Sequence, residues 1–192
     1  MQFMADVELE CEICKGKRFK DEVTAIKYNN VSIDMLLKMT IDECIQFFRK
    51  YNQTKIVNKL LPLQSVGLGY VSLGQSSNTL SGGEAQRIKL ASFIGKGDQI
   101  EKTFFIFDEP TTGLHFHDVK KLLNTFDKLI RMGHSILVIE HNLDMISYSD
   151  HIIDLGPEGG DKGGNIIAEG TPEEVIKNKE SYTGQYLRKK II

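Results

Sequence analysis

The second half of the chain alternates between two patterns of apolar residues. Short, almost wholly apolar runs at 103–107 and 135–139 are typical of buried strands. Helical spacing occurs at 81–94 and again between the two runs, where the second helix should end at Gly133. The apolar stripe of that second helix consists of Val119, Leu122, Leu123, Phe126 and Ile130. Apolar strands alternating with amphipathic helices predict an α/β fold, with a parallel sheet covered on both faces by helices.

Shorter elements complete this half of the chain. We expect a short helix from Asn142, and short strands at 151–155 and 165–168 joined by a Gly-rich turn. A terminal helix should begin at Thr171, because Pro172 and Glu174 are the residues that favour the first turn of a helix.

The first half of the chain is organised differently. Residues 1–28 are short, charged and extended in pattern, with apolar alternation around Val23 and Ile26, which predicts a β-ribbon around a C-x-x-C turn. Residues 32–66 look helical: 40–43 form a capping-box pattern, and Pro62 is expected to break or kink the last of these helices. The Gly-rich stretch 67–70 marks a boundary.

Composition and charge narrow the class of protein. Apolar and charged fractions of 41% and 26% are ordinary for a globular protein, and 192 residues can bury a real core. A net charge of −2 means that any nucleic-acid contact needs a local basic patch. No apolar run is long enough to span a bilayer, and the start of the chain lacks a signal-peptide pattern. Three cysteines, two in a C-x-x-C, favour a reducing compartment, and the cytoplasm is the expected location.

The sequence Leu-Ser-Gly-Gly-Glu at 80–84 has the form of an ABC-type signature. Ser81 and the exposed amides of Gly82 and Gly83 would present a positive helix terminus to a phosphate. A plain capping box formed by Ser81 and Glu84 is the structural alternative. Such a cap gains nothing from two glycines, which cost about 1 kcal/mol each inside a helix, but the signature alone leaves the two interpretations balanced. Residues 85–87 behind it and a Walker B-type strand further along the chain favour phosphate binding by Leu80, Ser81, Gly82, Gly83 and Glu84.

Acidic residues follow the first apolar run, and a histidine follows the second. Asp108 and Glu109 end a Walker B-type strand, at the edge of an open α/β sheet where ligands bind. Asp108 would hold the water shell of Mg²⁺, and Glu109 would orient and polarise an attacking water. His141 should reach the same edge and contact the γ-phosphate as a switch histidine. The alternatives are acids that merely cap the next segment and a structural or solvated histidine.

A phosphate-binding loop of the form G-x-x-x-x-G-K-[ST] does not occur in the 192 residues. The stretch 69–76 has its spacing, but Gln75 replaces the lysine and no buried strand precedes it. The glycines at 159–164 link two short strands and are expected to form a turn. The chain is therefore expected to lack a complete nucleotide site and to be inactive alone.

Cys11 and Cys14 could be half of a four-cysteine zinc site. Cys44 lies on a predicted helix face, so two thiolates are left and they do not close a tetrahedral site. Basic residues beside the C-x-x-C could touch a phosphate backbone, although a solvated face is the commoner explanation for such a run. They are Lys15, Lys17, Arg18 and Lys20.

These motifs together resemble the C-terminal part of the UvrA family, the ABC-type ATPase component of the excinuclease in bacterial nucleotide excision repair. The resemblance covers essentially the whole chain. It rests on residues 11–19 (CEICKGKRF), 79–87 (TLSGGEAQR), 108–115 (DEPTTGLH), 139–144 (IEHNLD), 154–160 (DLGPEGG) and 169–174 (EGTPEE).

The resemblance implies a domain organisation. Residues 1–30 would be the second half of a zinc module, 31–79 a helical signature subdomain, and 80–192 the C-terminal half of an ABC ATPase core. The fold would thus be the C-terminal portion of an ABC-type module preceded by a β-ribbon remnant.

The resemblance also implies a function in DNA repair. It implies an ATP- and Mg²⁺-dependent ATPase that scans damaged duplex DNA, contains Zn²⁺ in full length, and works as a homodimer with UvrB, away from membranes. In such proteins Asp108, Glu109 and His141 complete one nucleotide site, whereas the signature caps a nucleotide held by the opposing module, here the family's N-terminal ABC module. The alternatives are a transporter or translation-type ABC protein, disfavoured by Glu84 and the cysteine pair, and a non-catalytic scaffold that binds DNA or partners.

Overall fold

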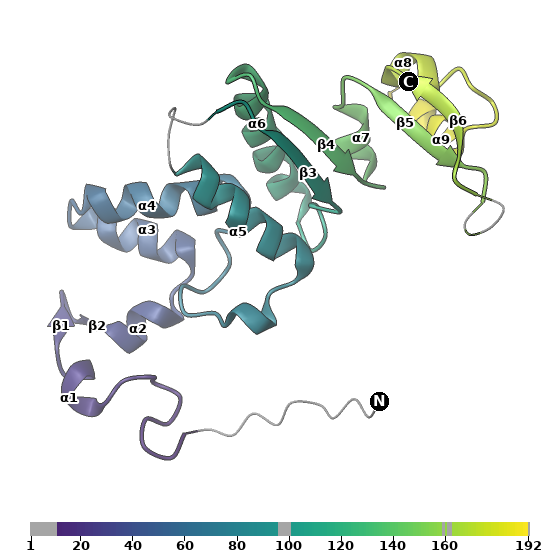
Figure 1. Ribbon diagram of the computed structural model, residues 1–192. Helices are drawn as coiled ribbons and strands as arrows, with labels where there is room; N and C mark the ends of the chain where they lie inside the picture. The colour runs from purple at the N-terminus through teal and green to yellow at the C-terminus, as the bar shows by residue number, and fades with distance from the viewer. Residues whose placement is uncertain (1–10, 96–100, 159, 161–162, 192) are drawn as a thin grey trace. The chain divides into compact units, whose positions relative to one another are not determined.

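The computed structural model describes residues 11–95, 101–158, 160 and 163–191, and divides the chain into two compact units (Figure 1). The first unit comprises Met1–Gln64 and Leu68–Leu80, and the second comprises Ser65–Gly67 and Ser81–Ile192. Val7 and Leu9, part of the expected ribbon, lie outside the described residues. In the described part of the chain, no helix is long and apolar enough to cross a membrane.

The first unit is mainly helical. It contains α1 (Asp21–Thr24), the antiparallel pair β1 (Lys27–Tyr28) and β2 (Val31–Ser32), α2 (Ile33–Lys38), α3 (Ile41–Lys50), most of α4 (Thr54–Ser65) and the 3₁₀ turn η1 (Ser77–Thr79). The capping box expected at the start of α3 is present, with the Thr40 hydroxyl accepting from the Glu43 N–H and the Glu43 carboxylate accepting from the Thr40 N–H. The start of α3 is bonded to the loop after α4, because the N–H groups of Ile41 and Asp42 donate to the carbonyls of Val71 and Gly69. The core of this unit consists of Ile41, Cys44, Ile45, Phe48, Val57, Leu60, Leu68 and Val71.

The second unit contains two small sheets. Strands β3 (Phe104–Asp108) and β4 (Ser135–Ile139) are parallel, and β5 (Ile152–Gly156) and β6 (Asn165–Gly170) are antiparallel. Helix α5 (Gly82–Ile94) precedes β3, and α6 (Phe116–Arg131) connects β3 to β4 and packs against them, with ring contact between Phe107 and Phe126. The remaining helices are α7 (Leu143–Ser147), α8 (Pro172–Val175) and α9 (Tyr182–Ile191). The α/β architecture with a parallel sheet and flanking helices, predicted from the sequence, is confirmed.

A small core joins the last elements of the second unit. Ile152 on β5 and Ala168 on β6 pack with Val175 of α8 and Leu187 of α9. An ion pair between Lys190 and Asp144, 2.5 Å apart, adds a polar link between α9 and α7.

One face of the β3–β4 pair is not covered by the described residues. Phe104 and Ile106 on β3 are 62% and 61% exposed, and Leu137 and Ile139 on β4 are 42% and 55% exposed. These four side chains share a face, because the register pairs Ile106 with Leu137. Among the described residues α6 covers one face of this pair only, which differs from the expectation that helices would cover both faces.

Three local features also differ from the expectations, in whole or in part. Residues 21–24, around Val23, form the helix α1 instead of a ribbon strand, because local bonds such as Ala25 N–H to the Asp21 carbonyl satisfy the backbone without a partner strand. Pro62 lies inside α4, which continues for three more residues, so the break expected at this proline does not occur. Ile130 is 44% exposed, and Leu129 takes its place in the buried stripe of α6.

Candidate functional site

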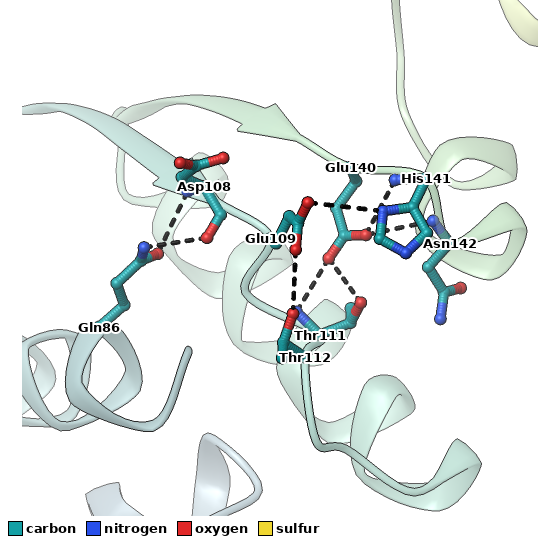
Figure 2. Close-up of polar contacts among 8 residues, drawn as sticks. All are labelled: Gln86, Asp108, Glu109, Thr111, Thr112, Glu140, His141 and Asn142. Atoms are coloured by element: carbon teal, nitrogen blue, oxygen red, sulfur yellow. Dashed lines mark hydrogen bonds and ion pairs between the residues drawn. The ribbon is translucent and has the colours of Figure 1, made fainter. Parts of the chain in front are cut away.

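The carboxyl ends of β3 and β4 bring Asp108, Glu109 and His141 to one edge of the sheet (Figure 2). The Glu109 N–H donates to the Ile139 carbonyl of β4 at 2.9 Å, which aligns the two strand ends. His141 Nδ1 then lies 3.8 Å from Glu109 Oε1, and both side chains are open to solvent. The sheet therefore places a carboxylate and an imidazole together where a ligand can reach both.

The backbone of Glu109 has an unusual conformation. Its φ of 46° lies in the left-handed region, which costs a residue other than glycine about 1–3 kcal/mol. Two hydrogen bonds hold it there: the bond to Ile139, and the bond from the Thr112 N–H to the Glu109 carbonyl at 3.1 Å. The Thr112 hydroxyl also approaches Glu109 Oε2 at 3.4 Å. Strain of this kind, maintained by surrounding contacts, is often found at functional sites.

Glu140 joins the segments that follow the two strands. Its Oε1 accepts from the Thr111 N–H at 2.8 Å and from the Thr111 hydroxyl at 2.5 Å. Its Oε2 accepts from the N–H groups of His141 and Asn142, both at 3.1 Å. Glu140 and Thr111 lie within the 139–144 and 108–115 motifs, but the sequence assigned no role to either residue. The position of Glu140 in its motif, between a buried strand and a candidate histidine, is the signal that could have indicated it.

The signature residues begin α5 as predicted. Ser81 is the N-cap: its hydroxyl accepts from the Glu84 N–H at 3.2 Å, and its own N–H donates to the Glu84 carboxylate at 2.8 Å. Gly82 is exposed, and a Cβ placed there would meet no described atom within 4 Å. Ser81 and Gly82 thus remain available for a ligand.

Gly83 differs from the expectation of an exposed glycine, because it is buried. A Cβ at this position would lie 3.2 Å from the Thr112 carbonyl oxygen and 3.4 Å from that of Glu109. The missing side chain lets α5 approach the turn after β3 closely. Close packing against this turn is therefore a structural reason for a glycine at position 83, and the sequence motif does not reveal it.

Two side chains of α5 fix the helix to β3 and the turn that follows. Gln86 accepts from the Asp108 N–H at 3.2 Å and donates to the Asp108 carbonyl at 2.9 Å, on the edge of β3 that faces away from β4. Arg87 is fully buried and donates through Nη1 to the carbonyls of Pro110 at 2.5 Å and Thr112 at 3.2 Å. Helix α5 and the candidate acids consequently form one rigid arrangement.

The candidate metal ligands differ in how well they suit the expected ions. Asp108 offers an exposed carboxylate, which suits Mg²⁺ because that ion typically takes one or two protein carboxylates together with phosphates and water. The residues that the structure describes contain no cluster of three or more His, Cys, Asp or Glu side chains placed to hold a metal. Cys11 is exposed, and hydrogen bonds led by the Cys14 backbone lower the pKa of its thiol. Cys44 is buried in α3, so Cys11 and Cys14 alone do not fit a closed zinc site.

Comparison with known proteins identifies the family. No protein-family model matches the chain. UvrABC system protein A of Clostridium acetobutylicum is 56% identical over 189 residues, which are 98% of this chain and 20% of that protein. The same protein of Rickettsia prowazekii is 52% identical over 192 residues, covering 100% of this chain and 20% of that protein. The crystal structure of UvrA2 from Deinococcus radiodurans matches 93% of this chain and 22% of that chain, with a TM-score of 0.78 and 39% identity.

The sequence belongs to the UvrA family. It spans about a fifth of the length of the curated UvrA relatives that it matches. The resemblance drawn from the motifs is therefore confirmed for the family and for the fold. The roles assigned to individual residues, from Leu80 to His141, and the division into residues 1–30, 31–79 and 80–192 remain predictions.

Proposed function

We propose that this chain supplies part of the ATPase machinery of a UvrA-type protein of nucleotide excision repair, and does not hydrolyse ATP alone. The observation that carries the proposal is the 3.8 Å separation of Glu109 and His141 at the ends of two parallel strands, with Asp108 as the last residue of β3. That edge of an open α/β sheet is where nucleotides bind. Relatives at 52–56% identity over nearly the whole chain supply the family.

The roles follow from chemistry and position. Glu109 would accept a hydrogen bond from the attacking water and polarise it, and His141 beside it would contact the γ-phosphate. Asp108 would hold Mg²⁺ through water, and the ion would neutralise charge that develops on the phosphates. Ser81, Gly82 and the start of α5 would meet the phosphates of a second nucleotide, held by an opposing module.

The uncovered face of the β3–β4 sheet supports an incomplete ATPase core. Parallel sheets are normally buried on both faces, and Phe104, Ile106, Leu137 and Ile139 present a contiguous apolar surface instead. In the proposal, the part of the longer protein with the phosphate-binding loop covers this surface. DNA, UvrB, a second copy and the N-terminal module would be partners of that longer protein, with ATP and Mg²⁺ as its cofactors. Zn²⁺ would need ligands besides Cys11 and Cys14.

A chimera tests the proposal directly. The segment of the Clostridium acetobutylicum relative that this chain matches is replaced by this chain, and ATP hydrolysis is measured with and without Glu109→Gln. General bases typically contribute 10²–10⁴-fold to a rate, so Glu109→Gln should lower kcat by at least about 100-fold. Glu173→Gln, a change of an exposed carboxylate on α8, is the matched control and should leave kcat unchanged.

The outcomes separate the alternatives. Nanomolar ATP binding or turnover by the 192-residue chain alone would contradict the incomplete site. A chimera that binds damaged DNA and hydrolyses ATP equally well with Glu109→Gln would favour the non-catalytic scaffold for this segment. Loss of hydrolysis with retained DNA binding supports the proposal.

A further inference from the structure

Glu140 accepts four hydrogen bonds, two on each carboxylate oxygen, and the donors come from two separate segments of the chain. Thr111 follows β3 and contributes its N–H and its hydroxyl to Oε1. His141 and Asn142 follow β4 and contribute their N–H groups to Oε2. Figure 2 shows the carboxylate lying between the two segments.

The number and type of donors suit an ionised carboxylate. An ionised carboxylate accepts only, with about four lone-pair sites, and here each oxygen receives two donors. A side-chain amide at this position would keep one acceptor oxygen and turn an NH₂ group toward two N–H donors. No ion pair joins Glu140 to a Lys, Arg or His side chain among the described residues. Its charge is thus balanced by backbone and hydroxyl dipoles, which form strong hydrogen bonds to a carboxylate.

The two segments that Glu140 joins carry the two candidate groups of the site. Thr111 is buried and lies two residues after Glu109, whose strained backbone is bonded to Thr112. His141 carries the imidazole that lies 3.8 Å from the Glu109 carboxylate. The hydrogen bonds that Glu140 accepts from Thr111 and from the His141 backbone therefore fix the distance between the segment that carries Glu109 and the segment that carries His141.

We propose that Glu140 is a positioning residue for ATP hydrolysis: it holds the segment after β4 to the segment after β3, so that Glu109 and His141 keep one relative placement. The inference rests on the proposed function of that site. Glu140 acts through these two groups and makes no contact with substrate.

Hydrogen exchange on the 192-residue chain tests the structural half of the proposal. Glu140→Gln should speed amide exchange at His141 and Asn142 by about tenfold or more, because charge-assisted hydrogen bonds to these amides are lost. Glu140→Asp keeps the charge but is one methylene shorter, so amide exchange should stay slow in one of the two segments and become faster in the other. Glu173→Gln should leave these amides unchanged. Unchanged exchange at Thr111, His141 and Asn142 in Glu140→Gln would overturn the proposal.

Kinetics of the chimera test the functional half. Glu140→Gln should lower kcat by about tenfold or more and leave KM for ATP within about twofold, because binding does not require the two groups to be aligned. The effect of Glu140→Gln should be smaller in a His141→Ala background than in the unmodified chimera, because part of the role of Glu140 is to place His141. A normal kcat, a change confined to KM, or full additivity with His141→Ala would each overturn the inference. If the unmodified chimera hydrolyses no ATP, the proposed function fails instead, and the exchange data alone then decide whether Glu140 joins the segments.

Discussion

The pairing of Gln86 with the Asp108 backbone gives a sharp prediction about how α5 is held to the sheet. The Gln86 side chain donates to the Asp108 carbonyl and accepts from its N–H, as a neighbouring strand would do. Gln86→Ala removes both bonds. Gln86→Glu keeps the acceptor for the N–H but, when ionised, cannot donate to the carbonyl.

The magnitude follows from the count and exposure of these bonds. Two net hydrogen bonds at about 0.5–1.5 kcal/mol each give about 1–3 kcal/mol, and the solvent exposure of this pair favours the lower half of the range. Gln86→Ala should therefore destabilise the α5–β3 contact by about 1–2 kcal/mol. Gln86→Glu should cost at least half of this at pH 7, because a carboxylate then faces the carbonyl oxygen. Below a pH of about 4 the introduced carboxyl is protonated and can donate, so part of the loss should be recovered.

Amide exchange of Asp108, followed by NMR together with urea unfolding, measures this effect. An opening free energy lower by about 1–2 kcal/mol corresponds to exchange about 5- to 30-fold faster. Gln46→Ala, a change of an exposed glutamine inside α3, controls for the general effect of replacing glutamine by alanine, which has the higher helix propensity. Asp108 exchange that is equally slow in the wild type and in Gln86→Ala would refute the reasoning, as would Gln86→Glu matching the wild type at pH 7.

Three further predictions concern other parts of the chain. Thr40→Ala should lower the free energy of unfolding by about 1 kcal/mol through loss of the α3 N-cap, measured by urea titration. A hydrogen bond to Asp127, and the charge of that carboxylate, raise the pKa of Tyr148. The interaction between Tyr148 and Asp127 thus stabilises the fold fully below the ordinary tyrosine pKa of about 10, and this stabilisation is lost as pH rises through the pKa of the folded state. Tyr148→Phe should therefore make the free energy of unfolding depend less steeply on pH above a pH of about 10. Burial raises the pKa of Cys44, so iodoacetamide should label exposed Cys11 quickly and Cys44 only after unfolding, as mass spectrometry would show.

Local sequence signals predicted the elements that have local causes. The capping boxes at Thr40 and Ser81 and the apolar run ending at Ile139 are short-range patterns, and the structure shows the two helix starts and the strand at those positions. The predictions that went wrong depended on tertiary surroundings. Ile130 and Leu129 are adjacent and both apolar, and only the packing of α6 on the sheet decides which one is buried.

The contacts around the candidate site show the same division. The sequence alone predicts that Asp108, Glu109 and His141 lie at one edge of the sheet, because parallel strands end at a common edge. The bonds between Glu140 and Thr111 bridge 29 positions of the chain, and hydrogen-bond geometry of that range leaves no periodic trace in a sequence. The burial of Gly83 leaves no local sequence signal either, because it comes from the backbone of the distant turn that contains Glu109 and Thr112.

The hydrogen bonds between Gln86 and Asp108 also determine at which edge a further strand can join this sheet. The outer edge of β3 is occupied at Asp108 by a side chain of α5, so an added strand has no access to its backbone there. The outer edge of β4 has no strand beside it among the described residues. A further parallel strand would therefore join β4, and its carboxyl end would emerge next to Glu140 and His141. A phosphate-binding loop after such a strand would begin beside the histidine, with β4 between it and Asp108.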